Sequence, residues 1–543
     1  MHPPAALIRV LQARALPVLA GALLILLVVA INGRPGLFAD TDDYLVNGRN
    51  TVMTVAYALH LKAAPEPSDD PDQIEQDRQE QLELRLQFGS RTPWYGVPLY
   101  ALQKLGTLWL VAAVQSAIAA WLIWLTWRAL APKAPGWTAY AAEGVGVAGS
   151  TLPFFAGFAM PDVFAGFTAL GVALLIGAWG TLGPLEVAGL TALVAYSVTV
   201  HSSHVLLTLS LLAVGMAGGW LVGRPRRAIL ASAACVGGAL TVGVLVGLLS
   251  MAAVKWTTGD TPGRPPFLSV RLLADGPGRG YLKRACDHGA PYALCRFRNL
   301  PLDDTEEILW SDNPKLGIYE TSDYPTRLRL VREDLSFAVG TVLSDPVGVA
   351  ASSMRNWGAQ IVKVWAEEPL RDPYYYLTND YWKDTNLPAL VYAMGGCGQD
   401  HHGCKPRFGP AQSGWWDSIT FVLALAAIGC RLARRDVREA LARRADDETT
   451  QTLLILGLVL AALALNALIC GAISGPFIRY QGRISWIAVV AAAAVLAGLY
   501  GKSRAFASPS TEHPREGGDP SVRADRAASA MLDGSPPSRG HTE

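Results

Sequence analysis

The sequence predicts an all-α polytopic membrane protein with about ten transmembrane helices and an extracytoplasmic insertion domain that is α-rich or mixed. Of its 543 residues, 51% are hydrophobic and only 17% are charged. A soluble globular chain carries about 25% charged residues. The deficit of charged residues is concentrated in long apolar runs, which are typical of membrane-spanning helices rather than of one large soluble core. The formal net charge of +1 by itself indicates nothing about partners. We expect no nucleic-acid partner.

Ten apolar runs come close to the roughly 20 residues that a helix needs to cross a bilayer. They cover residues 15–33, 107–127, 137–158, 163–182, 187–201, 205–223, 228–254, 415–432, 451–474 and 485–501. Only a break at Gly180, Gly183 and Pro184 separates the fourth run from the fifth. We expect the spans to be nearly free of ionisable residues except at their ends, and the chain contains no internal repeat.

The Lys and Arg residues of the short loops predict the orientation, because such residues collect on the cytoplasmic side. With the amino terminus inside, every short basic cluster but one falls on the inner face. The exception is Arg479 and Arg483 in the last outer turn. We therefore expect an integral protein of a bacterial inner membrane, with cytoplasmic N- and C-termini and large periplasmic loops. Residues 1–31 also fit a signal peptide, which would leave the remaining topology unchanged.

The spans divide the chain into four regions. Residues 1–255 form a transmembrane core with a long first outer loop at 34–106, and residues 256–414 form the extracytoplasmic domain. Residues 415–502 return to the membrane, and residues 503–543 form a polar cytoplasmic tail that we expect to be disordered. Helical patterns outside the membrane occur at 43–61, at 75–105 and, broken near Asp345-Pro346, from about Thr326 to Trp365.

Four of the seven cysteines lie in the insertion domain: Cys286, Cys295, Cys397 and Cys404. Their grouping in one polar region predicts disulfides, and hence an oxidising compartment. Four cysteines allow three connectivities. The pairs Cys286–Cys295 and Cys397–Cys404 are favoured because short loops close at low entropic cost. The histidines between Cys397 and Cys404 leave a zinc site open as the alternative for that pair.

Three carboxylates in four residues, Asp40, Asp42 and Asp43, follow the first span. Such a cluster can supply a general base at the membrane edge. Asp40 and Asp42 could also hold a divalent metal, Mg²⁺ or Mn²⁺, through their oxygen atoms. The alternative is a solvated turn that caps a helix beginning near Tyr44.

A fourth acid, Asp162, lies in the tight turn between the third and fourth spans. An acid at the membrane boundary needs a partner or a water-filled cavity, although it could simply cap the following helix.

Two further outer turns carry polar side chains. His201 and His204 lie where the fifth span reaches the outer surface, and on a continuous helix their spacing would place them on one face. They could bind a metal, donate to phosphate or cap a helix pair. The last turn reads Arg479-Tyr480-Gln481-Gly482-Arg483. Arginine recognises phosphate with two parallel hydrogen bonds, so an anionic lipid would explain this pair. Arginines at the membrane interface beside aromatic rings are the alternative.

This layout resembles the C-type (GT-C) membrane glycosyltransferases, which include protein mannosyltransferases and lipid A aminoarabinose transferases. Asp40-x-x-x-Tyr44 is similar to the acidic motif of the family's first outer loop, and Met160-Pro161-Asp162 resembles a second acidic position. The resemblance covers residues 1–255 and the last outer loop. It implies a polyprenyl-phosphate-linked sugar as donor and membrane lipids as surroundings. The insertion domain matches no branch of the family.

The sequence therefore favours transfer of a hexosyl or pentosyl group from a polyprenyl-phosphate donor to an extracytoplasmic lipid, glycan or protein. Asp40 would be the base, assisted by Asp42 or Asp43, and Arg479 and Arg483 would neutralise the phosphate. Asp162 and His204 would line the acceptor side, with Tyr44, His201, Tyr480 and Gln481 also contacting substrate. The rival classes are a transporter or lipid flippase, and a non-catalytic assembly protein or sensor.

Overall fold

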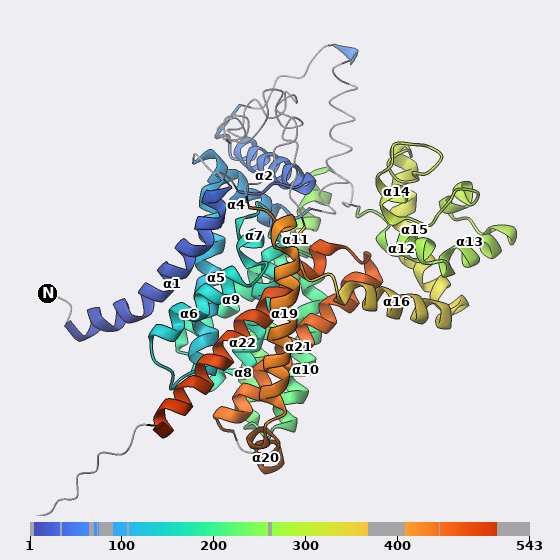
Figure 1. The fold of residues 1–543 in the computed structure, drawn as a ribbon. Helices are drawn as coiled ribbons and strands as arrows, with labels where there is room; N and C mark the ends of the chain where they lie inside the picture. Colours follow the sequence, from blue (N-terminus) through green and yellow to red (C-terminus); the bar gives the residue numbers. More distant parts are fainter. Residues whose placement is uncertain are drawn as a thin grey trace, which may run out of the picture. The chain divides into compact units, whose positions relative to one another are not determined.

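The computed structural model describes residues 5–32, 35–63, 70–72, 74, 91–105, 108–258, 263–367, 408–444 and 446–507. Every regular element in these ranges is a helix, which confirms the predicted all-α class for this part of the chain (Figure 1). Residues Met1–Gly501 form one compact unit. The last helix continues to Ala507, so the predicted tail begins later than residue 503, and the rest of that tail lies outside the described residues.

The membrane core is built from α1 (Ala5–Ile31), α5 (Trp109–Leu130), α6 (Trp137–Ala148), α7 (Leu152–Gly157), α8 (Phe164–Gly177), α9 (Pro184–Val200), α10 (Ser203–Leu221), α11 (Arg226–Thr258), α19 (Pro410–Leu432), α21 (Glu448–Ile473) and α22 (Ile478–Ala507), with 3-10 turns η1 (Pro161–Val163) and η2 (Trp179–Thr181). The segment predicted as the first outer loop contains α2 (Ala39–Ala58) and α4 (Pro93–Lys104), and α20 (Arg435–Arg443) lies between α19 and α21 in the chain. The insertion contains α12 (Phe267–Asp275), α13 (Pro277–Asp287), η3 (Ala293–Phe297), α14 (Thr305–Trp310), α15 (Tyr324–Ser344) and α16 (Pro346–Ile361).

Six described helices are long and apolar enough to cross a membrane: α5, α10, α11, α19, α21 and α22. Three shorter apolar helices cover Ala15–Ile31, Pro161–Gly177 and Pro184–Val200. The total of ten spans stays a prediction. The predicted span 137–158 is wrong as a single helix, because the chain breaks between α6 and α7. The Ser150 hydroxyl donates to the Gly146 carbonyl there, and Pro153 is the second residue of the new helix.

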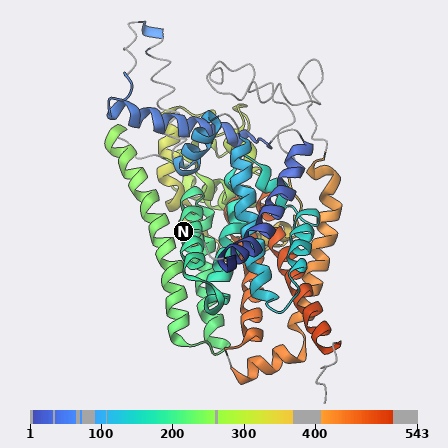
Figure 2. The same cartoon turned by 90° about the vertical axis from the view of Figure 1, so that its left-hand side faces the viewer.

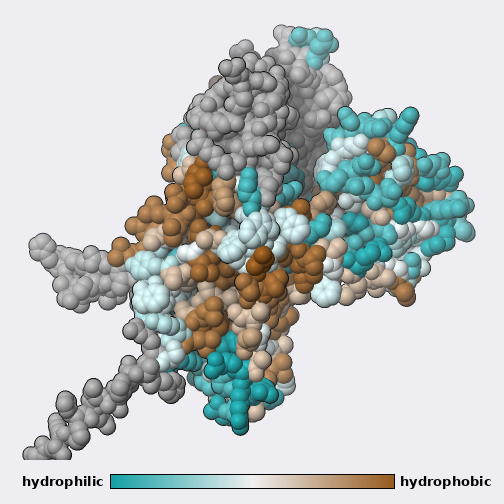
Figure 3. Space-filling model, in the orientation of Figure 1, coloured by the Kyte–Doolittle hydropathy of each residue, from teal (hydrophilic) through white to brown (hydrophobic). Residues whose placement is uncertain are grey.

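Loops predicted to share the inner face meet at one end of the helical bundle. Three ion pairs link them: Arg128–Glu186, Arg224–Asp446 and Lys133–Glu448. The arginine-rich helix α20 lies at this end and makes it hydrophilic, whereas the flank of the bundle is apolar (Figure 3). The pairing of Glu186 with Arg128 places the turn near 183–186 at this end, a turn to which the charge rule assigned no side.

The opposite end is closed by α2, which lies across the helices in both views (Figures 1 and 2). Gly36 forms a β-bridge with Phe158, which ties the first outer loop to the turn that precedes Asp162. Helix α2 begins at Ala39, four residues before the predicted start at 43, because Thr41 caps the Phe38 amide. The acidic cluster therefore lies inside the first turn of α2 rather than in a loop before it.

Helices α2 and α4 cross where two glycines meet. A methyl group added at Gly48 would lie 2.1 Å from the Gly96 carbonyl oxygen, so only glycine allows this separation. The close crossing carries Arg91, immediately before α4, to the start of α2.

The insertion domain has its own apolar core, which includes Leu273, Ile308 and Phe337. The predicted disulfide Cys286–Cys295 is present. Cys397 and Cys404 lie outside the described residues, so their pairing stays a prediction. The predicted break near Asp345-Pro346 is confirmed, and α15 and α16 meet there at 107°.

Candidate functional site

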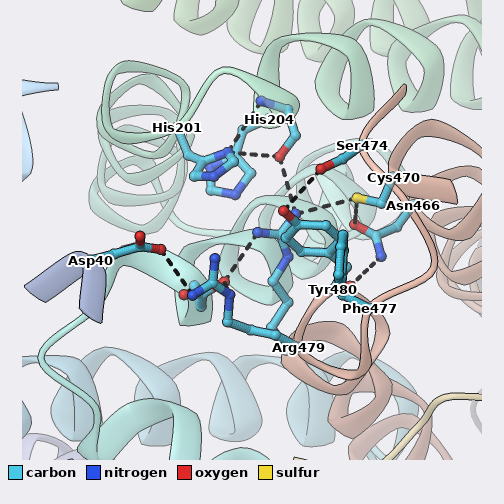
Figure 4. Close-up of polar contacts among 12 residues, drawn as sticks. Asp40, His201, His204, Asn466, Cys470, Ser474, Phe477, Arg479 and Tyr480 are labelled. Atoms are coloured by element: carbon cyan, nitrogen blue, oxygen red, sulfur yellow. Dashed lines mark hydrogen bonds and ion pairs between the residues drawn. The ribbon is translucent and has the colours of Figure 1, made fainter. Parts of the chain in front are cut away.

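The acids and arginines predicted from separate outer loops form one continuous cluster (Figure 4). An oxygen of Asp40 lies 2.9 Å from Nη1 of Arg479, and Nε of the same arginine lies 3.7 Å from Asp162. Arg483 donates to the same Asp162 oxygen at 3.2 Å. The start of α2, the turn η1 and the start of α22 thus contribute one alternating chain of opposite charges.

Helix α22 places both arginines on one face, since residues four apart lie one above the other. The preceding turn contains Gly475 at φ +147°, a backbone conformation that favours glycine. Gly482 lies against the Trp365 carbonyl, and the Thr151 hydroxyl donates to the Gly482 carbonyl at 2.7 Å. Packing from α7 and from the segment after α16 therefore sets the position of the arginines.

The two arginines differ in exposure. The Arg483 side chain is only 1% exposed and the Arg479 side chain is 21% exposed. Arg483 also donates to the Ser203 hydroxyl at 3.1 Å and to Cys470 Sγ at 3.5 Å. Because its guanidinium is bonded to Asp162, Ser203 and Cys470, Arg483 holds these three side chains in place. The predicted role of Arg483 in direct phosphate binding is therefore not favoured, whereas Arg479 keeps a partly accessible surface.

Asp40 is held between two guanidinium groups, Arg479 on one oxygen and Arg91 on the other. Burial alone would raise the pKa of the Asp40 carboxyl, but Arg91 and Arg479 outweigh it and lower that pKa below its ordinary value. The sequence analysis missed Arg91. Its position directly before the Thr92-Pro93 helix start, in the same outer loop as Asp40, was the available signal.

Asp43 lies one turn along α2, with an oxygen 3.4 Å from Nε of Arg91. Burial raises the pKa of Asp43 to about 6, and the attraction of Arg91 opposes this rise. The side chain of Asp42 lies outside the described residues. Within the described ranges no three His, Cys, Asp or Glu side chains are grouped to hold a metal ion. The proposed Asp40 and Asp42 metal site gains no support, because Arg91 and Arg479 occupy both Asp40 oxygens.

His201 and His204 do not lie on one continuous helix, so the condition under which their spacing would place them on one face is not met. His201 ends α9 and His204 lies in the first turn of α10, yet their rings pack 5.1 Å apart. His204 Nδ1 donates to the Ser197 carbonyl at 2.7 Å, so its Nε2 carries the lone pair. That Nε2 is buried and has no hydrogen-bond partner among the described residues. His201 Nδ1 accepts from the Ser203 hydroxyl at 2.8 Å, which links the histidines to Arg483.

The remaining predicted residues have structural contacts. Gln481 is fully buried, accepts from Asn466 at 3.0 Å and donates to the Leu463 carbonyl at 3.2 Å. Both ends of its amide are occupied inside the protein, so a substrate contact by Gln481 is not favoured. The Tyr480 hydroxyl lies 3.0 Å from the Ser474 hydroxyl, and its ring packs against both arginines. Tyr44 is buried against the Tyr95 ring, within the protein core.

A second acid that sequence reasoning missed is Glu367, six residues beyond α16. Burial raises the pKa of Glu367, and Arg479 acts in the opposite direction through charge and a backbone hydrogen bond. Thus a residue of the insertion also borders Arg479.

Comparison with known proteins assigns the chain to no family. No protein-family model, no curated protein and no solved structure matches the chain.

Proposed function

We propose that this protein is an integral membrane glycosyltransferase that uses a polyprenyl-phosphate-linked sugar. The observation that carries the proposal is the position of Arg479, a partly exposed guanidinium between Asp40 and Asp162 at one end of an apolar helical bundle. A lipid-linked phosphate that reaches this end of the bundle would meet a cation directly beside a carboxylate. The orientation of this end toward the periplasm of a bacterial inner membrane is part of the proposal.

The phosphate and Asp40 compete for the same guanidinium. When a donor phosphate draws Arg479 toward itself, Asp40 keeps only Arg91, and its pKa rises toward its ordinary value. Donor binding would then make Asp40 a stronger base, because basicity follows pKa. Arg483 stays on Asp162 throughout and keeps that carboxylate, Ser203 and His201 in register.

In the transfer step, the acceptor hydroxyl gives its proton to Asp40 and its oxygen forms a bond to the anomeric carbon. The bond between that carbon and the phosphate oxygen breaks, and polyprenyl phosphate leaves with the electron pair. Arg479, with Arg91 beside it, neutralises the charge that develops on the leaving phosphate. The anomeric configuration is inverted because one displacement occurs. Asp40 then returns its proton to solvent.

The test uses the full chain in lipid nanodiscs with a panel of undecaprenyl-phosphate-linked hexoses and pentoses. Release of undecaprenyl phosphate is measured by liquid chromatography and mass spectrometry. Asp40→Asn should lower kcat by about 100-fold or more, as for loss of a general base. Arg479→Gln should lower kcat/KM for the donor by a similar factor. Arg435→Gln, an exposed arginine at the opposite end of the bundle, is the matched control and should retain activity.

Two results would overturn these assignments. A folded Asp40→Asn protein with full transfer activity would remove Asp40 as the base. Absence of release from every donor, together with no retention of undecaprenyl phosphate by the wild-type protein, would remove the glycosyltransferase proposal.

One observation favours the transporter or flippase as a second candidate. Glu143 of α6 is fully buried against α1, where a methyl group added at Gly21 would lie 2.2 Å from its carboxyl oxygen. Its two oxygens have no hydrogen-bond partner among the described residues, and it lies well inside a predicted span. The sequence analysis expected spans nearly free of ionisable residues except at their ends, and Glu143 is an exception. Buried membrane carboxylates often mark ion-coupled passage. Loss of fluorescent-lipid flipping in Glu143→Gln, but not in Asp40→Asn, would select this function.

A further inference from the structure

Helix α16 has the reverse of the usual surface polarity. Its exposed face includes Val347 at 77%, Met354 at 53% and, just after the helix, Val362 at 63% exposure. The exposed positions between them are mainly small and apolar: Ala350, Ala351 and Gly358. A helix that borders water presents polar residues outward and apolar residues inward. An environment other than water is therefore indicated for the outer face of α16.

The inward face of α16 is polar. Ser352, Asn356 and Gln360 follow each other at intervals of four and are buried. Asn356 donates to both carboxyl oxygens of Asp275 at 2.9 Å, and Gln360 donates to the Phe477 carbonyl at 2.9 Å. These bonds hold the polar face on the protein, so α16 cannot rotate to bury its apolar face without breaking them.

The last turns of α15 continue the apolar surface. Leu335, Val339, Val342 and Leu343 are all exposed there. The first half of the same helix instead carries Arg327, Arg329, Arg332, Glu333 and Asp334. Polarity thus changes along α15, from charged at its start to apolar where it meets α16. We call the exposed apolar surface of residues 335–362 the elbow.

The elbow is not a membrane span, although its two helices together are long and apolar enough for one. Beyond α16, Lys363 donates to the Pro476 carbonyl, at the turn before α22. Before the elbow, Asp334 of α15 accepts a hydrogen bond from the Ser269 amide of α12 at 2.7 Å. Two residues further along α12, Arg271 lies 3.0 Å from where a methyl group on Gly475 would stand. Both flanks of the elbow therefore lie at the same end of the helical bundle.

Two features identify the medium that covers the elbow. The Trp357 ring nitrogen donates to the Ala464 carbonyl at 3.1 Å, which sets α16 against the side of the span α21. The elbow thus lies next to a helix that is long and apolar enough to cross a membrane. Basic residues border it, because Arg355 of α16 is exposed and the exposed Arg284 bonds Ser344 at the bend. Cations at this level complement anionic lipid headgroups.

We propose that the elbow is inserted into the lipid leaflet on the side of the insertion domain, with its apolar face among acyl chains and its basic border at the phosphates. Helix α16 then lies in the membrane interface, as amphipathic interfacial helices do. The insertion domain is held on the membrane at α21 and beside the turn that carries Arg479. The proposal stands on the elbow's own residues and does not depend on the chemistry of the cluster.

The test replaces Val347 or Met354, one at a time, with the photo-crosslinking residue p-benzoylphenylalanine in the full chain. Each protein is reconstituted in nanodiscs of phosphatidylcholine with phosphatidylglycerol and irradiated, and adducts are identified by mass spectrometry. Lys315, an exposed residue of the loop after α14, is the control position. Lipid adducts should be at least about tenfold more abundant at Val347 and Met354 than at Lys315, because only these sites would contact acyl chains.

Three outcomes would overturn the proposal. Crosslinks from Val347 to a second copy of the chain would assign the elbow to a protein interface instead. Equal lipid adducts at all three positions would show no specific insertion. Absence of lipid adducts at both elbow positions would show that the face does not reach the bilayer.

Discussion

Replacing Arg483 by Met should destabilise the protein more than any change at Arg479. Arg483→Met removes the charge and leaves the buried Asp162, among the described cations, with only Arg479 Nε at 3.7 Å. Breaking a buried ion pair by removing one partner costs about 3–5 kcal/mol, since the other charge stays buried. Arg479→Gln should cost only about 1 kcal/mol, because its side chain is 21% exposed and Asp40 keeps Arg91.

The assay is thermal unfolding of the purified protein in detergent, followed by tryptophan fluorescence. Trp486 is a suitable reporter, because it is fully buried and its ring nitrogen donates to the Arg483 carbonyl at 3.1 Å. The double variant Asp162→Asn/Arg483→Met removes both charges. Its loss of unfolding free energy should be about 1–3 kcal/mol smaller than the sum of the losses in the two single variants, because interacting neighbours are not additive. The single variants are compared at equal detergent concentration.

The reasoning would be refuted by the opposite order of effects. If Arg479→Gln lowered the melting temperature more than Arg483→Met, the more exposed arginine would be the structural one. Additive effects in the double variant would show that Asp162 and Arg483 do not depend on each other. Either result would also remove the division between a positioning arginine and a phosphate-binding arginine.

Three further predictions concern the surroundings of the site. Gly48→Ala should destabilise the α2–α4 crossing by more than about 2 kcal/mol through overpacking, whereas Gly136→Ala, with open space around it, should change little; equal melting temperatures would contradict this. The pKa of Asp43 is raised to about 6, so its protonated form is favoured in the folded protein and that stability is lost as pH rises through 6. Asp43→Asn should therefore gain up to about 1–2 kcal/mol relative to wild type as pH rises from about 4 to about 6, with no further gain above about pH 7, after allowance for solvent screening; a difference independent of pH would contradict it. Cys286→Ser/Cys295→Ser should cost the insertion domain about 2–3 kcal/mol by opening a short loop, and unchanged protease resistance of that domain would contradict this.

Properties that depend on neighbouring residues could be predicted from the sequence. Of the ten spans that the apolar runs predicted, six correspond to described helices that are long and apolar enough to cross a membrane, and the Asp345-Pro346 pair predicted the bend between α15 and α16. Short-loop closure correctly favoured Cys286–Cys295. The start of α2 was placed late, because the cap from Thr41 to Phe38 was not recognised. The break between α6 and α7 was missed, because hydropathy does not register a helix that stops within an apolar run.

The sequence by itself determined the membrane class, the distribution of charge between loops and the unusual position of Arg479 and Arg483. Only the tertiary structure decided which of these arginines is buried, since that depends on Ser203 and Cys470 from distant helices. It also decided that Arg91 shares Asp40 with Arg479. The physical reason is that ion pairing falls steeply with distance and burial, and both are set by how helices far apart in the chain pack together.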